Sequence, residues 1–292
     1  SAVWTGLPLK NRRRRNTGGT PVKVIRFETQ DGHVRTGRFI DPACAEILDG
    51  TIADGFSPTG RTEGIARLLA PVLPSDIFAI GFNYLEHARE TASAPPEYPV
   101  LFMKATSSLN HPFADIVLPT CETRGPETDF EGELAVVIGR TAKDVPEEDA
   151  LSYVAGYTCA NDVSARRWQK HAGGGQWIRG KSFDTFCPLG PWMVTADEID
   201  NPQALQLTTR LNGERMQHSC TSSMIFSVAA LIAYISRDTT LRPGTVILTG
   251  TPEGVGFTRE PRVFLKPGDE VCVTIDRIGT LRNTVRVPRN TD

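Results

Sequence analysis

The chain has 292 residues, of which 39% are hydrophobic and 23% are charged. This composition excludes disordered and fibrous proteins and suffices for one large core or two unequal domains. The 32 basic and 34 acidic residues leave a net charge of −2, so no overall field attracts nucleic acid or an anionic membrane. A small-molecule partner is therefore expected.

The N-terminal segment up to Pro21 differs from the rest of the chain. It is rich in Gly, Thr and Asn and contains the basic cluster Arg12–Arg15, so residues 1–20 are predicted to be a disordered basic tail. Binding of nucleic acid or a membrane by this cluster, and a place at the end of a mitochondrial presequence, are the alternatives.

Cysteine usage and hydropathy indicate the compartment. The six cysteines are scattered without a Cys-x-x-Cys motif, which favours a reducing compartment, either the cytoplasm or the mitochondrial matrix. No run of about 18 apolar residues occurs, so no membrane-spanning helix is predicted.

Residues 21–74 are predicted to form a small N-terminal α/β module. Alternating residues 22–29 and 34–40 flank a turn at Gln30–His33, which is typical of a β-hairpin. Glu63–Ala70 has the pattern of a short amphipathic helix, and Pro71–Pro74 reads as a connector.

Residues 75–292 are predicted to form a larger domain, mainly β with some α (α+β). Two helical segments are expected, at Pro146–Val154 and Ile225–Ser236. The strands are too irregularly interrupted for a doubly wound sheet. They are predicted at Ile77–Gly81, Val100–Lys104, Glu133–Gly139, Val154–Asn161, Leu205–Leu211, Thr245–Thr249 and Glu270–Ile275.

His87 and Glu90 follow the first of these strands. On a helical turn, residues three apart share a face, so the carboxylate could orient the imidazole as a general base. An exposed His–Glu helix pair is the alternative. The segment Thr91–Pro99 has the composition of a mobile loop, and it could be a lid that carries this pair.

Glu131, Glu133 and Asp162 are candidate metal ligands. In a strand, residues two apart point to the same face, where two carboxylates repel each other unless a cation lies between them. Asp162 closes a second apolar strand, and three carboxylates would bind Mg²⁺ or Mn²⁺ and leave room for water and substrate. The alternatives are a solvated edge strand for the two glutamates and a capping or turn role for Asp162.

Two glycine-rich segments complete the set of candidates. Gly173–Pro191 surrounds Lys181, which could stabilise a developing oxyanion, but its order does not fit a phosphate-binding loop. In Thr249–Gly256, the Thr251 hydroxyl and nearby amides could bind a carboxylate, although a plain turn between strands would look similar.

These motifs, in this order, resemble the fumarylacetoacetate hydrolase family over roughly Ile77 to Val285. The ordered set consists of Gly-x-Asn-Tyr-x-x-His, Glu-x-Glu-Leu, Asn-Asp-Val-Ser-Ala-Arg, Gly-Lys-Ser-Phe-Asp-Thr and Thr-Gly-Thr-Pro-x-Gly-Val-Gly. The chain is most similar to the domain-containing-2 branch, whose members are compared with oxaloacetate tautomerases. The resemblance implies a β-sandwich roll, a homodimer, and activity on 2-oxo or β-diketo acids.

The resemblance also implies roles for individual residues. Glu131, Glu133 and Asp162 would bind Mg²⁺ or Mn²⁺, while His87 and Glu90 would be the acid/base pair and Lys181 the electrophilic lysine. The implied substrate-binding residues are Phe102, Lys104, Arg166, Gln169 and Thr251.

Two positions depart from the family pattern. Arg167 stands where relatives commonly have Asp, and it either restores a positive charge or forms a surface ion pair. Phe82 stands where some acylpyruvate-cleaving relatives have Arg, and this loss weakens the case for a second substrate carboxylate at that spot.

The expected reaction proceeds through an enolate of the substrate stabilised by Mg²⁺ and Lys181. Hydrolysis of a C–C bond in an acylpyruvate or fumarylpyruvate is the expected outcome. Enol–keto tautomerisation or decarboxylation of oxaloacetate would use the same residues and remains open. A non-enzymatic interaction protein on this scaffold and a plain β-sandwich binding module are alternatives, but the retained acids, His-x-x-Glu pair and lysine argue against both.

Overall fold

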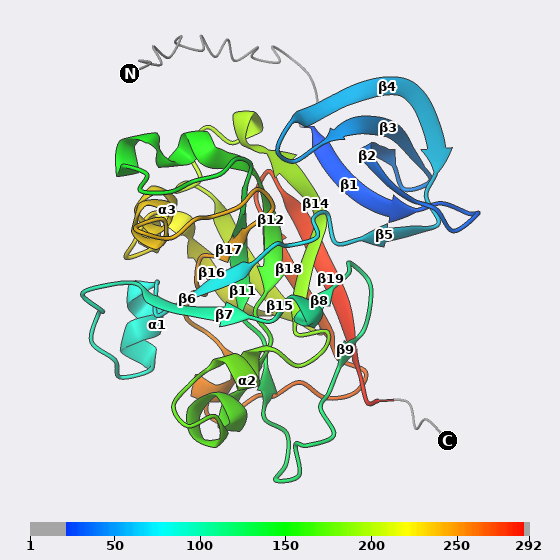
Figure 1. The fold of residues 1–292 in the computed structure, drawn as a ribbon. Coiled ribbons are helices and arrows are strands. Elements are labelled where there is room, and N and C mark those ends of the chain that lie inside the picture. Colours follow the sequence, from blue (N-terminus) through cyan, green and yellow to red (C-terminus); the bar gives the residue numbers. More distant parts are fainter. Residues whose placement is uncertain (1–21, 289–292) are drawn as a thin grey trace.

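The structure is a computed structural model that describes residues 22–288. Its strands form a 12-stranded sheet, a 5-stranded sheet and a short 2-stranded ladder, with few helices around them (Figure 1). The prediction of a mainly β protein with some helices is confirmed. The predicted tail at residues 1–20, with Arg12–Arg15, lies outside the described residues.

The N-terminal strands, blue in Figure 1, form one end of the large sheet. The predicted hairpin is confirmed, because residues 24–28 pair antiparallel with residues 34–38. The first strand also pairs with β14, so the sheet continues into the body of the molecule. The strands are β1 (Lys23–Glu28), β2 (Val34–Asp41), β3 (Cys44–Thr51), β4 (Gly55–Gly64) and β5 (Arg67–Leu69).

The helix predicted at Glu63–Ala70 is wrong. Glu63 and Gly64 end β4 and pair with β3, while Arg67–Leu69 form β5 and pair with β1. A segment of this length, with Gly64 inside it, cannot sustain a helix alone, and pairing with neighbouring strands satisfies its backbone groups instead. The division of the chain into an N-terminal module and a larger domain stays a prediction.

The middle of the large sheet carries the strands that surround the candidate site. The strands predicted in this region are confirmed within one residue at each end. In sheet order they are β14 (Cys187–Thr195), β12 (Val154–Asn161), β11 (Gly132–Ile138), β17 (Val246–Leu248), β6 (Ile77–Gly81) and β7 (Val100–Lys104), with β8 (Leu109–Asn110) beside β14. Of these, β14 and β8 were not predicted; β14 contains Pro188, Gly190 and Pro191, which read as loop.

The second sheet contains two predicted strands, β15 and β18, and strands that the sequence did not reveal. Its order is β16 (Glu214–Cys220), β15 (Gln206–Leu211), β18 (Glu270–Ile275), β19 (Gly279–Arg286) and β9 (Ile116–Val117). The polar sequence of β16 gave no strand signal. The 2-stranded ladder joins β10 (Thr128–Asp129) to β13 (Ser164–Ala165).

The predicted helical segments are present but shorter. Helix α3 (Val228–Ile235) begins after Ser227, whose side chain accepts a hydrogen bond from the amide of Ala230 and caps the helix. The predicted segment at Pro146–Val154 is a 3₁₀ helix over Glu147–Tyr153. Other helices are α1 (Leu85–Glu90), α2 (Ile178–Lys181), a π-helix at Trp168–Ala172, and 3₁₀ turns at Thr106–Ser108, Ala196–Glu198, Thr221–Ser223 and Gly256–Thr258.

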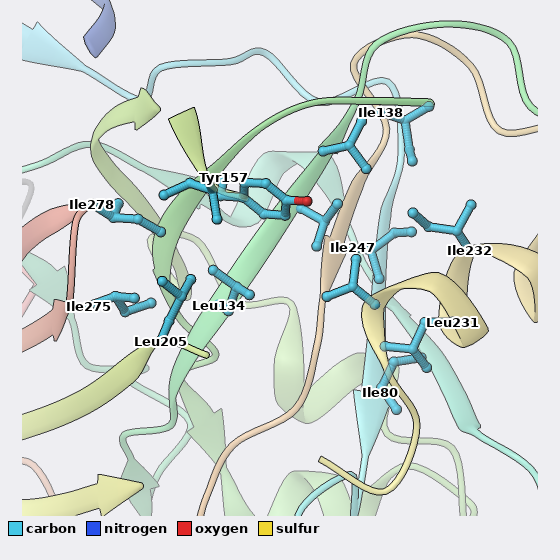
Figure 2. Close-up of a cluster of buried hydrophobic side chains, with 14 of the residues drawn as sticks. Ile80, Leu134, Ile138, Tyr157, Leu205, Leu231, Ile232, Ile247, Ile275 and Ile278 are labelled. Carbon is cyan, nitrogen blue, oxygen red and sulfur yellow. The ribbon is translucent and has the colours of Figure 1, made fainter. Parts of the chain in front are cut away.

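The main hydrophobic core lies between the two sheets and α3 (Figure 2). Leu134 and Ile247 from the large sheet share it with Ile275 from the smaller sheet and Leu231 from α3. Two sheets that bury one face each against the other form a sandwich. Glu133 points away from this core, because side chains alternate along β11 and Leu134 points into it.

Within residues 22–288, none of the helices is long and apolar enough to cross a membrane. Helices α1 and α2 lie toward the same end of the body in Figure 1, beside strand β7. This end holds the predicted site residues.

Candidate active site

Glu131, Glu133 and Asp162 come together as predicted, at the adjoining ends of β11 and β12. One carboxylate oxygen of each residue lies within 4.8 Å of the others. Their exposed fractions are 6%, 1% and 0%, and β11 lies between β12 and β17 inside the sheet. The alternative of a solvated edge strand is therefore wrong.

Two buried lysines contact this acidic cluster. Lys181 Nζ lies 2.8 Å from Glu131 Oε2 and 2.7 Å from Asp162 Oδ2, while Lys104 Nζ lies 2.5 Å from Asp162 Oδ1. Both lysines are about 1% exposed. The Asp162 carboxylate thus accepts from two ammonium groups, which a plain capping residue would not do.

The pKa values of Glu131 and Glu133 shift in opposite directions. Burial favours a raised pKa for Glu131, but the charges of Lys181, Arg166 and His87 lower its pKa to about 2. Burial raises the pKa of Glu133 well above its usual range, and the negative charges of Asp162 and Glu131 raise it further. Among the described residues, Glu133 has no basic side chain paired with it and accepts instead from the amide of Gly250 at 2.7 Å.

These donors fit a hard divalent cation. All three residues supply carboxylate oxygens, which suit Mg²⁺ or Mn²⁺ better than a softer metal. A cation between them would also relieve the repulsion that raises the pKa of Glu133. We therefore treat the cluster as a candidate metal site.

Arg166 and Gln169 lie beside the cluster. The Arg166 guanidinium contacts Glu131 Oε1 at 2.6 Å and Asp129 Oδ2 at 2.8 Å, and it donates to Gln169 Oε1 at 3.1 Å. Burial would lower the pKa of Arg166, but Glu131 and Asp129 raise it. The residue is a fixed positive charge in the site.

His87 and Glu90 form the predicted pair on α1. His87 Nδ1 lies 2.7 Å from Glu90 Oε1, and His87 is only 5% exposed. His87 is therefore not part of an exposed helix pair, although Glu90 is partly open to solvent. Since an ionised carboxylate only accepts hydrogen bonds, Nδ1 carries the proton when Glu90 is ionised, which leaves Nε2 to accept one.

A cavity of about 100 Å³ joins these groups. Several predicted site residues line it: His87, Phe102, Glu131, Arg166, Gln169, Lys181 and Thr251. Lys104 was expected to line this pocket and does not, because its ammonium group is buried behind Asp162. The movement of the Thr91–Pro99 lid stays a prediction, although Thr91 and Ser93 line the cavity.

The turn over Thr249–Gly256 binds carboxylates of the protein, and contact of Thr251 with a substrate stays a prediction. Its amides donate to carboxylates of the protein: Gly250 to Glu133, Gly254 to Glu90 and Gly256 to Asp129, at 2.7, 3.0 and 2.9 Å. The Thr251 hydroxyl donates to the carbonyl of Gly132 at 2.9 Å. The turn therefore positions site residues through its backbone, which a plain connecting turn would not do.

The two departures from the family pattern differ in their position relative to the cavity. Phe82 lines the cavity, with its ring stacked on His87 and edge-on to Trp177. Arg167 is outside the cavity lining and pairs with Glu127, with 3.3 Å between Nε and Oε1. Of the two expected outcomes for Arg167, the ion pair is the one observed.

The sequence reasoning missed Asp129, Trp177, Phe257 and Lys170. Asp129 is fully buried and accepts from Arg166 and from the amides of Gly256 and Phe257. It precedes Glu131 by two residues, so the alternation that revealed the glutamates could have revealed it. Trp177, Phe257 and Lys170 line the cavity from segments without a periodic pattern.

Known proteins resemble this chain over most of its length. Residues 76–286 match the model of the fumarylacetoacetate (FAA) hydrolase C-terminal family. A Bos taurus protein named "Oxaloacetate tautomerase FAHD2B, mitochondrial" is 48% identical over 244 residues, which are 83% of this chain and 76% of that protein. A 2,4-didehydro-3-deoxy-L-rhamnonate hydrolase from Sphingomonas sp. (strain SKA58) is 49% identical over 258 residues, 87% of this chain and 89% of the relative.

Comparison with solved structures also points to the fumarylacetoacetate hydrolase family. A fumarylacetoacetate hydrolase from the psychrophilic Exiguobacterium antarcticum is 37% identical, with a TM-score of 0.79 over 91% of this chain and 100% of that chain. The motifs that suggested the resemblance lie within the matched residues. The chain therefore belongs to the fumarylacetoacetate hydrolase family of enzymes.

Proposed function

We propose that the protein is a metal-dependent tautomerase that interconverts the enol and keto forms of oxaloacetate or a closely related 2-oxo dicarboxylic acid. One observation carries this proposal: the cavity that exposes Glu131 of the acidic cluster is also lined by His87, whose ring is oriented by Glu90. The name of the bovine relative supplies the substrate class.

Glu131, Glu133 and Asp162 would hold the metal, which we propose to be Mg²⁺ or Mn²⁺. When bound, the divalent cation would supply Lewis-acid stabilisation of negative charge on the 2-oxo group. Lys181 and Arg166 place two further positive charges next to Glu131, in a region from which water is largely excluded. Such fixed charges favour the negatively charged oxygen of an enolate over the uncharged keto group.

His87 would move the proton. Its Nε2 takes a proton from C3 of the keto acid, and Glu90 stabilises the imidazolium that results. The imidazolium then gives this proton to the oxygen of the 2-oxo group, so the enol forms and the neutral ring is regenerated. In the opposite direction the same atoms return the proton to C3. Phe82 and Trp177 cover this side of the cavity with aromatic rings, which limits the access of bulk water.

Hydrolysis of a C–C bond in an acylpyruvate is the second candidate. The His87–Glu90 pair has the geometry of a base that activates water, and the Sphingomonas relative is named as a hydrolase. Decarboxylation of oxaloacetate would need no water and would use the same positive charges. A non-enzymatic role on this scaffold is not supported, because the acids, the pair and Lys181 are all in place.

The experiment follows enol–keto exchange of oxaloacetate by ultraviolet absorbance, with acylpyruvate cleavage and CO₂ release scored separately. Glu133→Gln preserves the acceptor for Gly250 but removes a charge, so exchange should fall by about a thousandfold, since metal ions contribute several kcal/mol to such reactions. Stabilisation of the protein by Mn²⁺ in thermal unfolding should disappear in parallel.

The exposed Asp197→Asn serves as the matched control and should behave as the wild type. Full exchange activity in Glu133→Gln, or in wild-type protein stripped with EDTA, would refute the metal role. Cleavage of acylpyruvates without oxaloacetate exchange would refute the proposed tautomerase activity and support the hydrolase activity.

Assembly and location belong to the same proposal. We expect a homodimer, as the resemblance implies, and a reducing compartment, either the cytoplasm or the mitochondrial matrix. The six cysteines, none of them in a disulfide within residues 22–288, support the second expectation.

A further inference from the structure

The cavity has two chemically different walls. Phe82, Phe102 and Trp177 form an aromatic wall, in which both phenylalanine rings meet the Trp177 ring edge-on. On the other wall, Arg166 and Lys170 both lie against the ring of Phe257, at 4.3 and 4.0 Å from its centre. The aromatic rings carry no charge for an anion, and Lys181, whose ammonium group lies 5.1 Å from the centre of the Phe102 ring, is already paired with Glu131 and Asp162.

The basic wall continues out of the cavity. Arg166, Lys170 and Phe257 also line an adjoining groove of about 580 Å³, together with Arg167, His171 and Arg262. Lys170 is exposed at the junction of the two spaces, on the short π-helix that begins two residues after Arg166. A substrate bound at the acidic cluster could therefore extend toward Lys170.

The positive charges on this wall are not all neutralised by the protein. Arg166 pairs with Asp129 and Glu131, and Arg167 pairs with Glu127. Within residues 22–288, Lys170 makes no ion pair, and its ammonium group contacts the Phe257 ring instead. Burial and the neighbouring charges of Arg166 and Arg262 lower the pKa of Lys170, and the carboxylates of Glu131 and Asp129 only partly oppose this shift.

We propose that Lys170 binds the substrate carboxylate farthest from the 2-oxo group and so selects dianionic over monoanionic substrates. This inference rests on the proposed function. An ammonium group at a cavity mouth attracts a carboxylate through a charge-assisted hydrogen bond, which the aromatic wall cannot offer. It would supply a positive charge to a cavity in which Phe82 supplies none.

The test compares oxaloacetate with its 4-methyl ester, which keeps the 2-oxo acid but lacks the far charge. In Lys170→Met, KM for oxaloacetate should rise about tenfold, the effect of losing one charge-assisted hydrogen bond at an exposed site, while KM for the ester stays unchanged. Lys170→Arg should restore most of the preference. Lys143→Met, a change at an exposed lysine outside both spaces, is the control.

Equilibrium affinities for the two compounds, measured by calorimetry in a His87→Gln background, separate this inference from the proposed function. If wild-type protein performs no exchange but the affinity ratio of dianion to ester falls with Lys170→Met, the tautomerase is wrong and the role of Lys170 stands. If Lys170→Met leaves that ratio unchanged, or weakens both compounds equally, the role of Lys170 is overturned.

Discussion

The floor and the rim of the cavity are built in different ways. By the floor we mean the acidic cluster of Glu131, Glu133 and Asp162 together with Lys181, and Lys104 lies beneath it. All five residues are buried, and of these five Glu131 and Lys181 line the cavity. The rim consists of His87, Glu90 and Lys170, which come from a six-residue helix and a five-residue π-helix.

Because of this difference, substitutions in the floor and in the rim should have different effects. In the floor each charge contacts an opposite charge or a backbone amide, so one substitution leaves another charge buried and unpaired. In the rim the side chains are attached to short elements that can change without disturbing the sheets. We expect floor substitutions to change stability and activity together, and rim substitutions to change activity or substrate preference alone.

The largest expected effect is in the floor. Asp162→Ala leaves the ammonium groups of Lys104 and Lys181 without their shared partner, and the free energy of unfolding should fall by about 3–5 kcal/mol, as is typical when a buried ion pair is broken. Urea denaturation of the metal-free protein measures this loss. Asp197→Ala, at an exposed position, is the control, and equal stability of the two variants would show that the floor is not a stabilising network.

An intermediate effect is expected in the rim. His87→Gln can keep a hydrogen bond to Glu90 but cannot take up a proton, so kcat should fall by about 10²- to 10⁴-fold, the usual contribution of a general base. The free energy of unfolding should change by less than about 1 kcal/mol. Glu86→Gln, in the same helix but exposed, is the matched control. A large loss of stability in His87→Gln would end the distinction between floor and rim.

The smallest effect concerns pH, and it should arise outside both regions. His111 Nδ1 accepts from the amide of Ala70, and burial together with the charges of Arg67 and Arg26 lowers the pKa of His111 below its usual 6.5. The neutral ring is thus favoured in the folded chain, so its stabilisation is present above about pH 6.5 and is lost as the pH falls through the lowered pKa. Thermal unfolding between pH 7 and 5 should show this loss, and His111→Gln should reduce it. An unchanged pH dependence would contradict the assignment.

The acids of the floor could be predicted from sequence because they lie at the ends of two strands that pair with each other. Glu131 and Glu133 precede an apolar strand, and Asp162 closes the strand that pairs with it. Strand pairing then brings the acids together without further information. The His87–Glu90 pair was predictable for a similar reason, since both residues lie on one helical turn.

Other features depend on contacts between distant segments and could not be predicted. Phe257 and Trp177 reach the cavity from irregular segments, and a Cβ at Gly81 would lie 2.5 Å from the Trp177 ring, so this packing depends on a single missing side chain. The wrong helix at Glu63–Ala70 has the same origin, because partner strands decided a conformation that the local pattern left undecided. The resemblance implied that Lys104 binds the substrate, whereas Asp162 holds its ammonium group beneath the floor.

The turn that follows β17 links the floor to the rim. Three of its amides hold Glu133, Glu90 and Asp129, and Asp129 in turn holds Arg166. The spacing between the His87–Glu90 pair and the acidic cluster is therefore set largely by one short run of backbone. Side chains around the mouth can be exchanged for new substrates without altering that spacing, whereas an insertion of one residue in the turn would misalign the acids and the base together.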